Sequence, residues 1–231
     1  MGRALAQQLA ASGHAVAGFA RQPDGAELPP DMPVWAADAT DSAAVKAVFA
    51  KAADSLGGLD GYVHAIGNIL LKPAHLMKDE DFAAVVEKNL FTAFYGLREA
   101  VGLMRRQKSG SVVLVSSVAA GAGLANHEAI AAAKGGIEGL VRAAAATYAN
   151  FGLRINAVAP GLVDTPAAGS ILASDAARKF SASMHPLGRV GEPAEVASLI
   201  AWLLSADGDW VTGQVWGIDG GMGKVLPKPR G

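Results

Sequence analysis

Cysteine is absent from the 231 residues of the chain. This absence excludes disulfide bonds, a thiolate nucleophile and a zinc site built on thiolates. The histidines show no spacing of the HExxH type, so no metal site is predicted. They are His14, His64, His75, His127 and His185.

An excess of charge of one sign is also absent, since 20 lysines and arginines balance 21 aspartates and glutamates and the formal net charge is −1. The chain therefore has no excess of positive charge that would favour binding to nucleic acid or to an anionic membrane. No apolar run reaches the ~18 residues that a membrane-spanning helix needs, and the first residues are amphipathic where a secretory leader would be apolar. We expect a soluble cytoplasmic protein whose partner is a small molecule.

Short apolar segments of strand length alternate with helical segments along the chain. Hydrophobic residues make up 51% of it and no linker-like stretch divides it, so we expect one domain over residues 1–231. The alternation predicts an α/β, Rossmann-like, doubly wound fold, in which helices cover both faces of a parallel sheet and the ligand lies at the carboxyl ends of the strands. Strands are expected over 15–20, 34–37, 62–66, 111–116, 153–159 and 211–218, and helices over 2–13, 41–56, 79–107, 126–151 and 193–204.

The usual opening of such a fold cannot be recognised. A nucleotide-binding fold of this kind starts with a strand and a glycine-rich turn, which meets the pyrophosphate at a helix N-terminus. Here the helix over residues 2–13 comes first, and no GxGxxG motif precedes a helix. The first strand is therefore expected to be missing from this chain.

Six short motifs occur in a recognisable order and spacing. They are Asp38-Ala39-Thr40-Asp41, His64-Ala65-Ile66-Gly67, Glu87-Lys88-Asn89-Leu90, Val115-Ser116-Ser117, Pro160-Gly161-Leu162-Val163-Asp164-Thr165 and Ile218-Asp219-Gly220-Gly221. With them the chain resembles the short-chain dehydrogenase/reductase family over essentially its whole length. The resemblance implies hydride transfer between a nicotinamide cofactor and an alcohol or ketone.

The resemblance also implies roles for individual residues. Ser117 would orient the substrate carbonyl, Lys134 would bind the nicotinamide ribose, and Asn89 would hold a water in the proton relay. The family's proton donor is a tyrosine four residues before the lysine, and this chain has Ile130 there. Residues i and i+4 share a helix face, so Ile130 stands where the phenol is expected. None of the three tyrosines precedes a lysine by four residues.

The source of the proton is therefore open. His127 precedes Ile130 by three residues and has an ordinary pKa of about 6.5, which suits acid–base work. Glu128 is a poorer acid, because a helix N-terminus favours its charged form. An ordered water, held by Ser117, is a further source. Alternatively, Asn126 caps the helix, and His127 and Glu128 are only its solvated first turn.

Arg21 directly follows the strand over 15–20, where NAD enzymes carry an acid that binds the ribose 2′-hydroxyl. A guanidinium can hold a 2′-phosphate in a bidentate contact, whereas an acid would repel it. We therefore predict NADP, with NAD less favoured; a solvated loop arginine is the alternative. The residues assigned to cofactor binding, mostly through the resemblance, are Gly2, Arg21, Asp38, Ala39, Ala65, Gly67, Lys134, Pro160, Gly161, Val163 and Thr165.

Gly2 is similar to the last glycine of the family's Thr-Gly-x-x-x-Gly-x-Gly turn, so the resemblance places a strand and most of the phosphate loop before Met1. In the family's strand order that strand is central. Its omission would remove about six apolar side chains, on the order of 10 kcal/mol of burial. We expect either that the natural protein starts before Met1 or that another segment of the chain fills the gap.

The resemblance implies a homodimer or homotetramer, because the family joins its subunits through the helix that residues 129–149 form here and through the helix before it. Two functions remain open. One is an NADP-dependent oxidoreductase with a rearranged proton donor, and the other is a pseudoenzyme that keeps the fold as a dinucleotide-binding or scaffold protein. A truncated product that binds nothing is a third possibility. Residues 166–187 are expected to form an apolar lid with helical stretches, without a signature of the substrate.

Overall fold

The computed structural model describes residues 1–23 and 28–226 and alternates strands with helices, as predicted. The main elements are α1 (Gly2–Ala11), β1 (Gly18–Ala20), β2 (Val34–Ala36), α2 (Ser42–Leu56), β3 (Gly61–His64), α3 (Asp79–Val86), α4 (Thr92–Gln107), β4 (Gly110–Val115), α5 (Glu128–Tyr148), β5 (Leu153–Pro160), α6 (Asp175–Ser183), α7 (Pro193–Leu204) and β6 (Val215–Ile218). A π-helical turn, η2 (Glu87–Phe91), joins α3 to α4. Short 3₁₀ turns are η1 (Ala74–Leu76), η3 (Val118–Ala120), η4 (Ala149–Phe151), η5 (Pro166–Ala168) and η6 (Ala206–Gly208).

All strand pairs are parallel, but the sheet is in two pieces. One piece has the order β3-β4-β5-β6, and the other pairs β1 with β2. In the part of the chain that the structure describes, β1 and β3 are therefore edge strands, and no segment pairs with both of them. Of the two alternatives expected from the sequence, the one in which another described segment fills the gap between β1 and β3 is therefore wrong.

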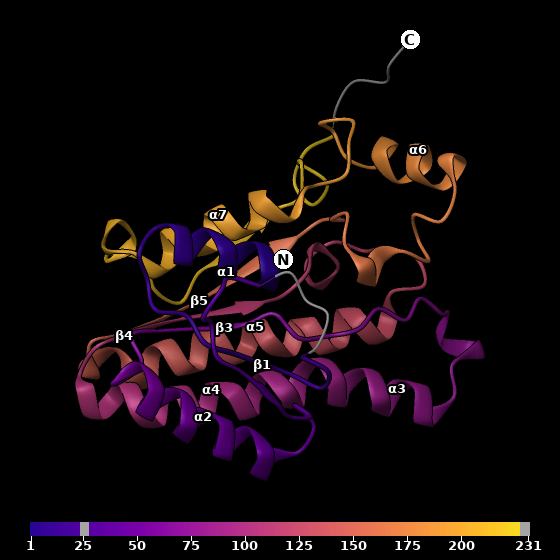
Figure 1. The fold of residues 1–231 in the computed structure, drawn as a ribbon. Helices are drawn as coiled ribbons and strands as arrows, with labels where there is room; N and C mark the ends of the chain where they lie inside the picture. The colour runs from indigo at the N-terminus through magenta and orange to yellow at the C-terminus, as the bar shows by residue number, and fades with distance from the viewer. Residues whose placement is uncertain (24–27, 227–231) are drawn as a thin grey trace.

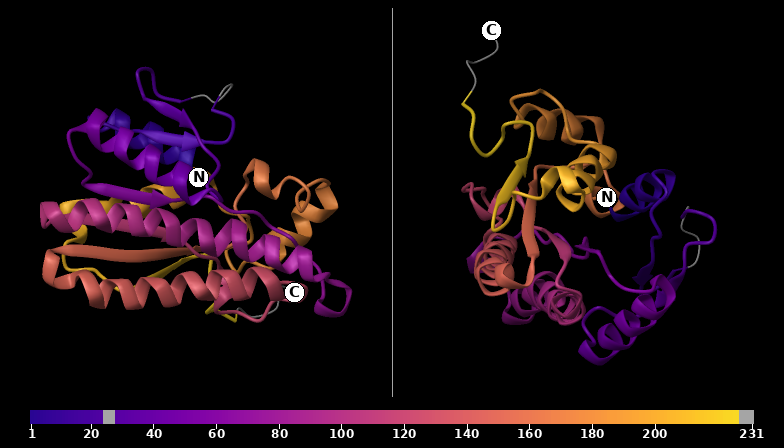
Figure 2. Two further views of the ribbon diagram at one scale, coloured as in Figure 1. Left: turned by 90° about the horizontal axis from the view of Figure 1, so that it is seen from below. Right: turned by 90° about the vertical axis from the view of Figure 1, so that its left-hand side faces the viewer.

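Helices cover both faces of the sheet, and this predicted arrangement is confirmed (Figures 1 and 2). Helices α2, α4 and α5 lie on one side, and α1 and α7 lie on the other. The strands contribute side chains to the cores on both faces of the sheet, because successive side chains point to opposite faces. In β4, Val112 and Leu114 join the core under α4 and α5, whereas Val113 and Val115 join the core under α7.

The helix ends that the sequence predicts best are those with side-chain caps. The Asp41 carboxylate accepts hydrogen bonds from the backbone N–H groups of Ala43 and Ala44, so α2 begins at Ser42. Helix α7 starts with Pro193 between two glutamates, Glu192 and Glu195, that form a capping box. Both starts agree with the predicted helices.

Other predicted boundaries are wrong. Helix α5 begins at Glu128 with His127 in the capping position, and Asn126 is not the cap, because its backbone is left-handed with φ of 64°. Strand β1 begins at Gly18 and not at residue 15, because its partner β2 follows Pro33, which has no N–H to extend the ladder. Strand β6 starts at Val215, after Gly213 turns the chain with φ of 72°.

The long helix predicted over residues 79–107 is present but contains the π-helical turn η2. Such turns insert one extra residue into a helix and occur often at functional sites. Asn89 lies in this turn and is fully buried. No helix among the described residues is long and apolar enough to cross a membrane.

Candidate functional site

The buried side chains of Lys134 and Asn89 meet beside the backbone of Gly67 at the carboxyl edge of the sheet. A Cβ atom on Gly67 would lie 2.5 Å from Asn89 Oδ1 and 3.4 Å from Lys134 Nζ, so only glycine fits there. Residue 67 follows β3, Asn89 comes from η2 and Lys134 from α5. The structure thus brings three of the predicted site residues to one point.

Lys134 is buried in α5, with 7% of its surface exposed. Its ammonium donates a hydrogen bond of 2.8 Å to the backbone carbonyl of Val115, the last residue of β4. Burial lowers the pKa of Lys134 from 10.5 to about 8. No carboxylate in the described part of the chain makes an ion pair with this ammonium.

The side-chain amide of Asn89 makes hydrogen bonds through its nitrogen but not through its oxygen. Its amide nitrogen donates to the Asn68 side chain at 2.8 Å and to the Val85 carbonyl at 2.9 Å. Its Oδ1 is buried and accepts no hydrogen bond from the described residues. Buried acceptors in proteins nearly always have a hydrogen-bond partner, so this oxygen is suited to accept a hydrogen bond from a group that enters the site.

Ser117 is two residues beyond Val115 and begins η3. Its Oγ accepts a hydrogen bond from the backbone N–H of Ala119 at 3.2 Å, and among the described residues its own proton has no acceptor. The neighbouring Ser116 donates instead to Glu138 Oε1, at 3.0 Å. Ser117 can therefore present a hydroxyl proton to a carbonyl oxygen.

Ile130 lies one turn before Lys134 on α5 and is 4% exposed. It packs in a small apolar cluster with Val85, Ala119 and Ala133. The position that the resemblance gives to a phenol is thus filled by a side chain with no proton to give.

His127 lies at the start of α5 and is partly exposed. Its Nδ1 lies 2.7 Å from the carbonyl oxygen of Ala125, to which it donates. Glu128, the other candidate, accepts a hydrogen bond of 3.3 Å from the Ala74 N–H. In this structure His127 therefore holds the loop before α5, and Glu128 holds the start of η1.

A buried chain of hydrogen bonds beside the site was not predicted from the sequence. Thr92 Oγ1 donates to the Lys88 carbonyl, so it accepts from Nε2 of His64, and Nδ1 of His64 accepts from the Tyr62 hydroxyl. Burial, assisted by the nearby charge of Lys134, lowers the pKa of His64 to about 3. His64 is therefore a neutral core histidine.

Arg21 and Asp38 lie at the carboxyl ends of β1 and β2. Asp38 accepts from the backbone N–H and the hydroxyl of Thr40, and these bonds lower its pKa, as do the charges of Arg21 and Lys88. Arg21 is exposed and makes no ion pair or hydrogen bond with another described residue. Ala39 is buried beside them.

Gly2 and Ala65 are neighbours in space. A Cβ atom on Gly2 would lie 3.6 Å from the Cβ of Ala65, so the first turn of α1 lies against the segment after β3. The structure thus brings the predicted cofactor residues Gly2 and Ala65 together.

The predicted cofactor loop begins at Pro160, the last residue of β5. Gly161 lies so close to His185 and Asp219 that a Cβ atom would come within 2.7 Å of His185 Nε2. Val163 is buried and bridges to Gly191. Thr165 precedes η5, and its hydroxyl lies 3.4 Å from the carbonyl of Val163.

The loop is tied to α6, which lies in the segment that is predicted to form a lid. The guanidinium of Arg178, from α6, holds both carboxylate oxygens of Asp164, with a shortest distance of 2.6 Å. The Arg178 bonds and charge lower the pKa of Asp164. The lid itself exposes apolar side chains, with Phe180 68% and Leu187 69% exposed.

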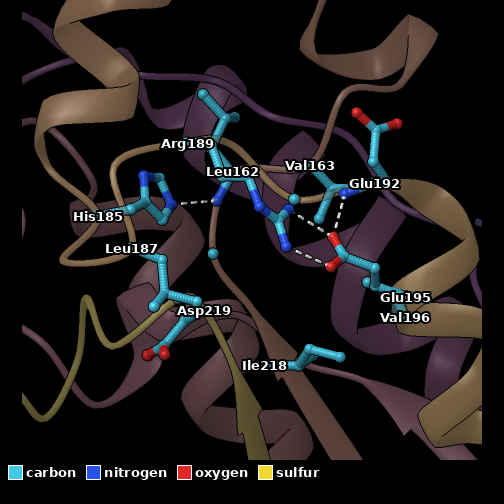
Figure 3. A pocket seen from close by; sticks show the side chains of 13 residues that line it. Leu162, Val163, His185, Leu187, Arg189, Glu192, Glu195, Val196, Ile218 and Asp219 are labelled. Carbon is cyan, nitrogen blue, oxygen red and sulfur yellow. Dashed lines mark hydrogen bonds and ion pairs between the residues drawn. The ribbon is translucent and has the colours of Figure 1, made fainter.

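His185 makes a second link between the loop and α6, and the sequence did not predict it (Figure 3). It is 3% exposed, its Nδ1 donates to the Ser181 carbonyl at 2.8 Å, and its Nε2 accepts from the Leu162 N–H at 3.2 Å. It lines a small pocket of about 120 Å³, beside the ion pair of Arg189 and Glu195. No sequence signal distinguishes a histidine with both ring nitrogens engaged from one that is solvated.

Replacing His185 by alanine is expected to lower the free energy of unfolding by about 2 kcal/mol, because two buried polar groups lose their partner. Proteolysis within α6 should become faster, because Ser181 loses its link to the loop at Leu162. Urea unfolding and limited proteolysis measure the two effects. The exposed His75, changed to alanine in the same way, is the control, and equal effects at both positions would contradict the role given to His185.

The described residues contain no group of three His, Asp or Glu side chains that could hold a metal ion. The edge of the sheet instead carries a buried lysine, a serine with a free hydroxyl proton and a loop tied to a lid. The parallel strands and the helices on both faces define a doubly wound α/β protein, and in such folds ligands bind at the carboxyl ends of the strands, where these residues lie.

Comparison with known proteins gives the family. A family model described as enoyl-(acyl carrier protein) reductase matches residues 1–223. The chain is 38% identical over 197 residues to the 3-oxoacyl-(acyl-carrier-protein) reductase of Thermotoga maritima, covering 84% of this chain and 78% of that one. It is 35% identical over 240 residues to levodione reductase of Leifsonia aquatica, covering 96% and 90%.

Solved structures agree with this result. The structure of ElxO with NADP bound superposes with a TM-score of 0.90 at 25% identity, covering 96% of this chain and 93% of that one. The chain belongs to the short-chain dehydrogenase/reductase family.

Proposed function

We propose that the protein is an NADP-dependent oxidoreductase that interconverts a ketone and an alcohol, and that it is an atypical member of its family, without the tyrosine and the glycine-rich turn. The observation that carries the proposal is the pair of Lys134 and Ser117 at the end of β4. Two relatives that cover most of this chain are named as reductases, which favours an enzyme over a scaffold.

The described residues fit a dinucleotide. Gly67 packs against Asn89 and Lys134, and Gly161 packs against His185, so a side chain at either position would displace residues beside the proposed site. Lys134 would hold the ribose next to the nicotinamide, and Val163 and Thr165 would hold the nicotinamide itself. When bound, the cofactor supplies the hydride.

The preference for NADP rests on Arg21. Its side chain is exposed at the end of β1 and has no partner among the described residues, so it can bind a 2′-phosphate without breaking another contact. ElxO, whose structure was solved with NADP, supports the same cofactor. Asp38, which is held by Thr40, and the buried Ala39 would lie near the adenine.

Changing Arg21 to glutamate is expected to weaken NADPH binding by about ten- to a hundredfold, because a contact with the 2′-phosphate is replaced by repulsion. NADH, which lacks this phosphate, should bind equally well or better. Fluorescence titration with both cofactors measures the change. An equal loss for NADPH and NADH would contradict the assignment of Arg21.

The substrate is proposed to be a carbonyl compound with an apolar body. Ser117 would donate its hydroxyl proton to the carbonyl oxygen, and the lid would cover the rest with Phe180, Met184 and Leu187, which are exposed. Relatives named for 3-oxoacyl and levodione substrates act on ketones of different sizes.

The test is to measure NADPH binding first and ketone-dependent NADPH oxidation second. Binding with turnover on any member of an apolar ketone panel supports the proposed reaction. Binding without turnover would favour the pseudoenzyme, for which Ile130 is the one specific observation. Absence of both would contradict the proposal.

We further infer a homodimer or homotetramer that assembles through α4 and α5. Phe91 at the end of η2 and Phe94 on α4 are 47% and 44% exposed, and Arg98 lies over the ring of Phe94 at 5.8 Å. Exposed aromatic groups of this kind are enriched at protein interfaces. A single domain over residues 1–231 and a cytoplasmic location stay predictions.

Phe94→Asp is expected to convert the oligomer to monomers, because a charge would be buried in the proposed helix bundle. Light scattering after gel filtration measures the mass. Phe151→Asp, at another exposed aromatic position beyond α5, is the control and should leave the mass unchanged. A monomeric wild-type protein would contradict the assembly.

A further inference from the structure

The C-terminal segment, residues 219–226, runs between two predicted parts of the active site. The N–H of Gly161, in the predicted nicotinamide loop, donates to the last carbonyl of β6 at 3.2 Å, just before the segment begins. Further along, a Cβ atom on Gly223 would lie 2.8 Å from Val118 Cγ2, so the backbone of Gly223 packs on this side chain. Val118 is buried and directly follows Ser117. The C-terminal segment therefore connects the nicotinamide loop with the turn that carries the serine.

The same segment contacts the end of the predicted lid. The N–H of Leu187 donates to the carbonyl of Gly220 at 3.1 Å, and Figure 3 shows Leu187 at this end of the pocket. A Cβ atom on Gly221 would lie 3.1 Å from Pro186 Cγ and 3.4 Å from Val225 Cβ, so these two side chains flank one point. Three predicted parts of the site, namely the loop, the lid and η3, thus meet at the C-terminal segment.

Asp219 holds the C-terminal segment in this shape. Its Oδ1 accepts from the N–H of Gly221 at 2.9 Å, and its Oδ2 accepts from the N–H of Gly223 at 2.8 Å. Hydrogen bonds to a charged acceptor are about twice as strong as neutral ones. Among the described residues no cation forms an ion pair with this carboxylate, so it serves the backbone alone. Asp219 therefore fixes the distance over which the segment reaches from β6 to η3.

Two exposed apolar side chains lie where the lid and the C-terminal segment meet. Leu187 is 69% exposed and Val225 is 56% exposed. Apolar surface of this kind, next to a few polar groups, is typical of a place where a ligand binds. Because the segment packs on the turn of Ser117, a substrate whose carbonyl oxygen lies at that hydroxyl has this apolar surface beside it.

We propose that the C-terminal segment is a wall of the substrate site, where Leu187 and Val225 receive the apolar group of the ketone. Asp219 is the positioning residue that holds this wall beside Ser117. The inference rests on the proposed oxidoreductase function and deepens it. The substrate class that it assigns is a ketone with an alkyl or ring group long enough to reach from Ser117 to Val225.

Val225→Asp tests the wall with two ketones of different length. We expect the KM for methyl heptyl ketone to rise by about tenfold or more, because a charge replaces apolar surface, whereas the KM for acetone and the affinity for NADPH should stay unchanged. Trp210→Asp is the control, since Trp210 is fully exposed but precedes β6, at the opposite edge of the sheet. An unchanged KM for the long ketone, or an equal rise for acetone, would overturn the proposal.

Asp219→Ala tests the positioning role. It removes both acceptors, and we expect kcat/KM for methyl heptyl ketone to fall by about tenfold or more, with NADPH affinity changed by less than about threefold. Asp219→Asn keeps an oxygen that accepts one of the two N–H groups, so it should restore part of the loss. Equal losses of kcat/KM and of NADPH affinity would show that Asp219 only stabilises the fold, and would overturn this role.

A fluorescent label gives a readout that does not depend on turnover. The chain has no cysteine, so Val225→Cys can carry a single solvent-sensitive fluorophore. Methyl heptyl ketone, added with the oxidised cofactor so that no reaction occurs, should shift the emission to shorter wavelength. The same label on Trp210→Cys should show no shift. An unchanged emission at residue 225 would overturn the wall. A shift there, in a protein whose wild type shows no turnover, would support the wall and overturn only the proposed reaction.

Discussion

Replacing Ile130 by tyrosine is expected to raise the rate of ketone reduction by about a hundredfold or more. Ile130 lies one helical turn before Lys134 on α5, so a phenol at residue 130 would stand on the same helix face as the ammonium. The charge of Lys134 would favour the ionised phenol and bring its pKa closer to neutral. NADPH oxidation with a ketone substrate measures the gain.

Ile130→Phe is the matched control, because it adds nearly the same ring without the hydroxyl. Ile130 is almost fully buried beside Val85 and Ala133, so either aromatic ring costs about 1–3 kcal/mol of stability through overpacking. The comparison of tyrosine with phenylalanine removes this common cost. Equal rates for the two variants would contradict the view that this position lacks only a proton donor.

Replacing Lys134 by methionine is expected to raise the free energy of unfolding at neutral pH, compared with the wild-type protein. This difference between the two proteins should shrink as the pH rises. The pKa of Lys134 is lowered by burial to about 8 in the folded state, against the ordinary 10.5. Between these values the unfolded chain binds more protons than the folded one, so the stability of the wild-type protein rises with pH. The pH-dependent part of the difference is about 3 kcal/mol.

Urea unfolding of both proteins at pH 7, 8.5 and 10 measures this difference. The variant also loses the hydrogen bond to the Val115 carbonyl, which costs about 1 kcal/mol at every pH and does not alter the slope. Lys46→Met, on the surface of α2, should show no such slope. If the difference in the free energy of unfolding stayed constant from pH 7 to pH 10, the pKa of Lys134 would not be lowered by burial.

Much of the fold follows from local signals in the sequence. The apolar strand segments and the Asp41 cap predict the alternation of elements and the start of α2, because these signals act within a few residues. Gly67 and Lys134 were also predicted as site residues, and the structure places them close together. Spacing along α5 alone shows that Ile130 and Lys134 share a face.

Features that depend on distant partners were not predictable. The length of β1 is set by Pro33 on its neighbour, and the left-handed Asn126 moves the start of α5. The roles of His64 and His185 depend on groups far away in sequence, such as Thr92 and Leu162. Periodicity carries no information about these contacts, because each side chain finds its partner only after the chain has packed.

The central claim is that this chain transfers hydride to a ketone without the tyrosine. The most direct test is to incubate the wild-type protein with NADPH carrying deuterium at the transferable C4 position and with an apolar ketone, then to examine the product by mass spectrometry and proton NMR. The expected product is an alcohol with one deuterium on the carbinol carbon. Tight NADPH binding without deuterium in any product would contradict the central claim and identify the protein as a binding scaffold.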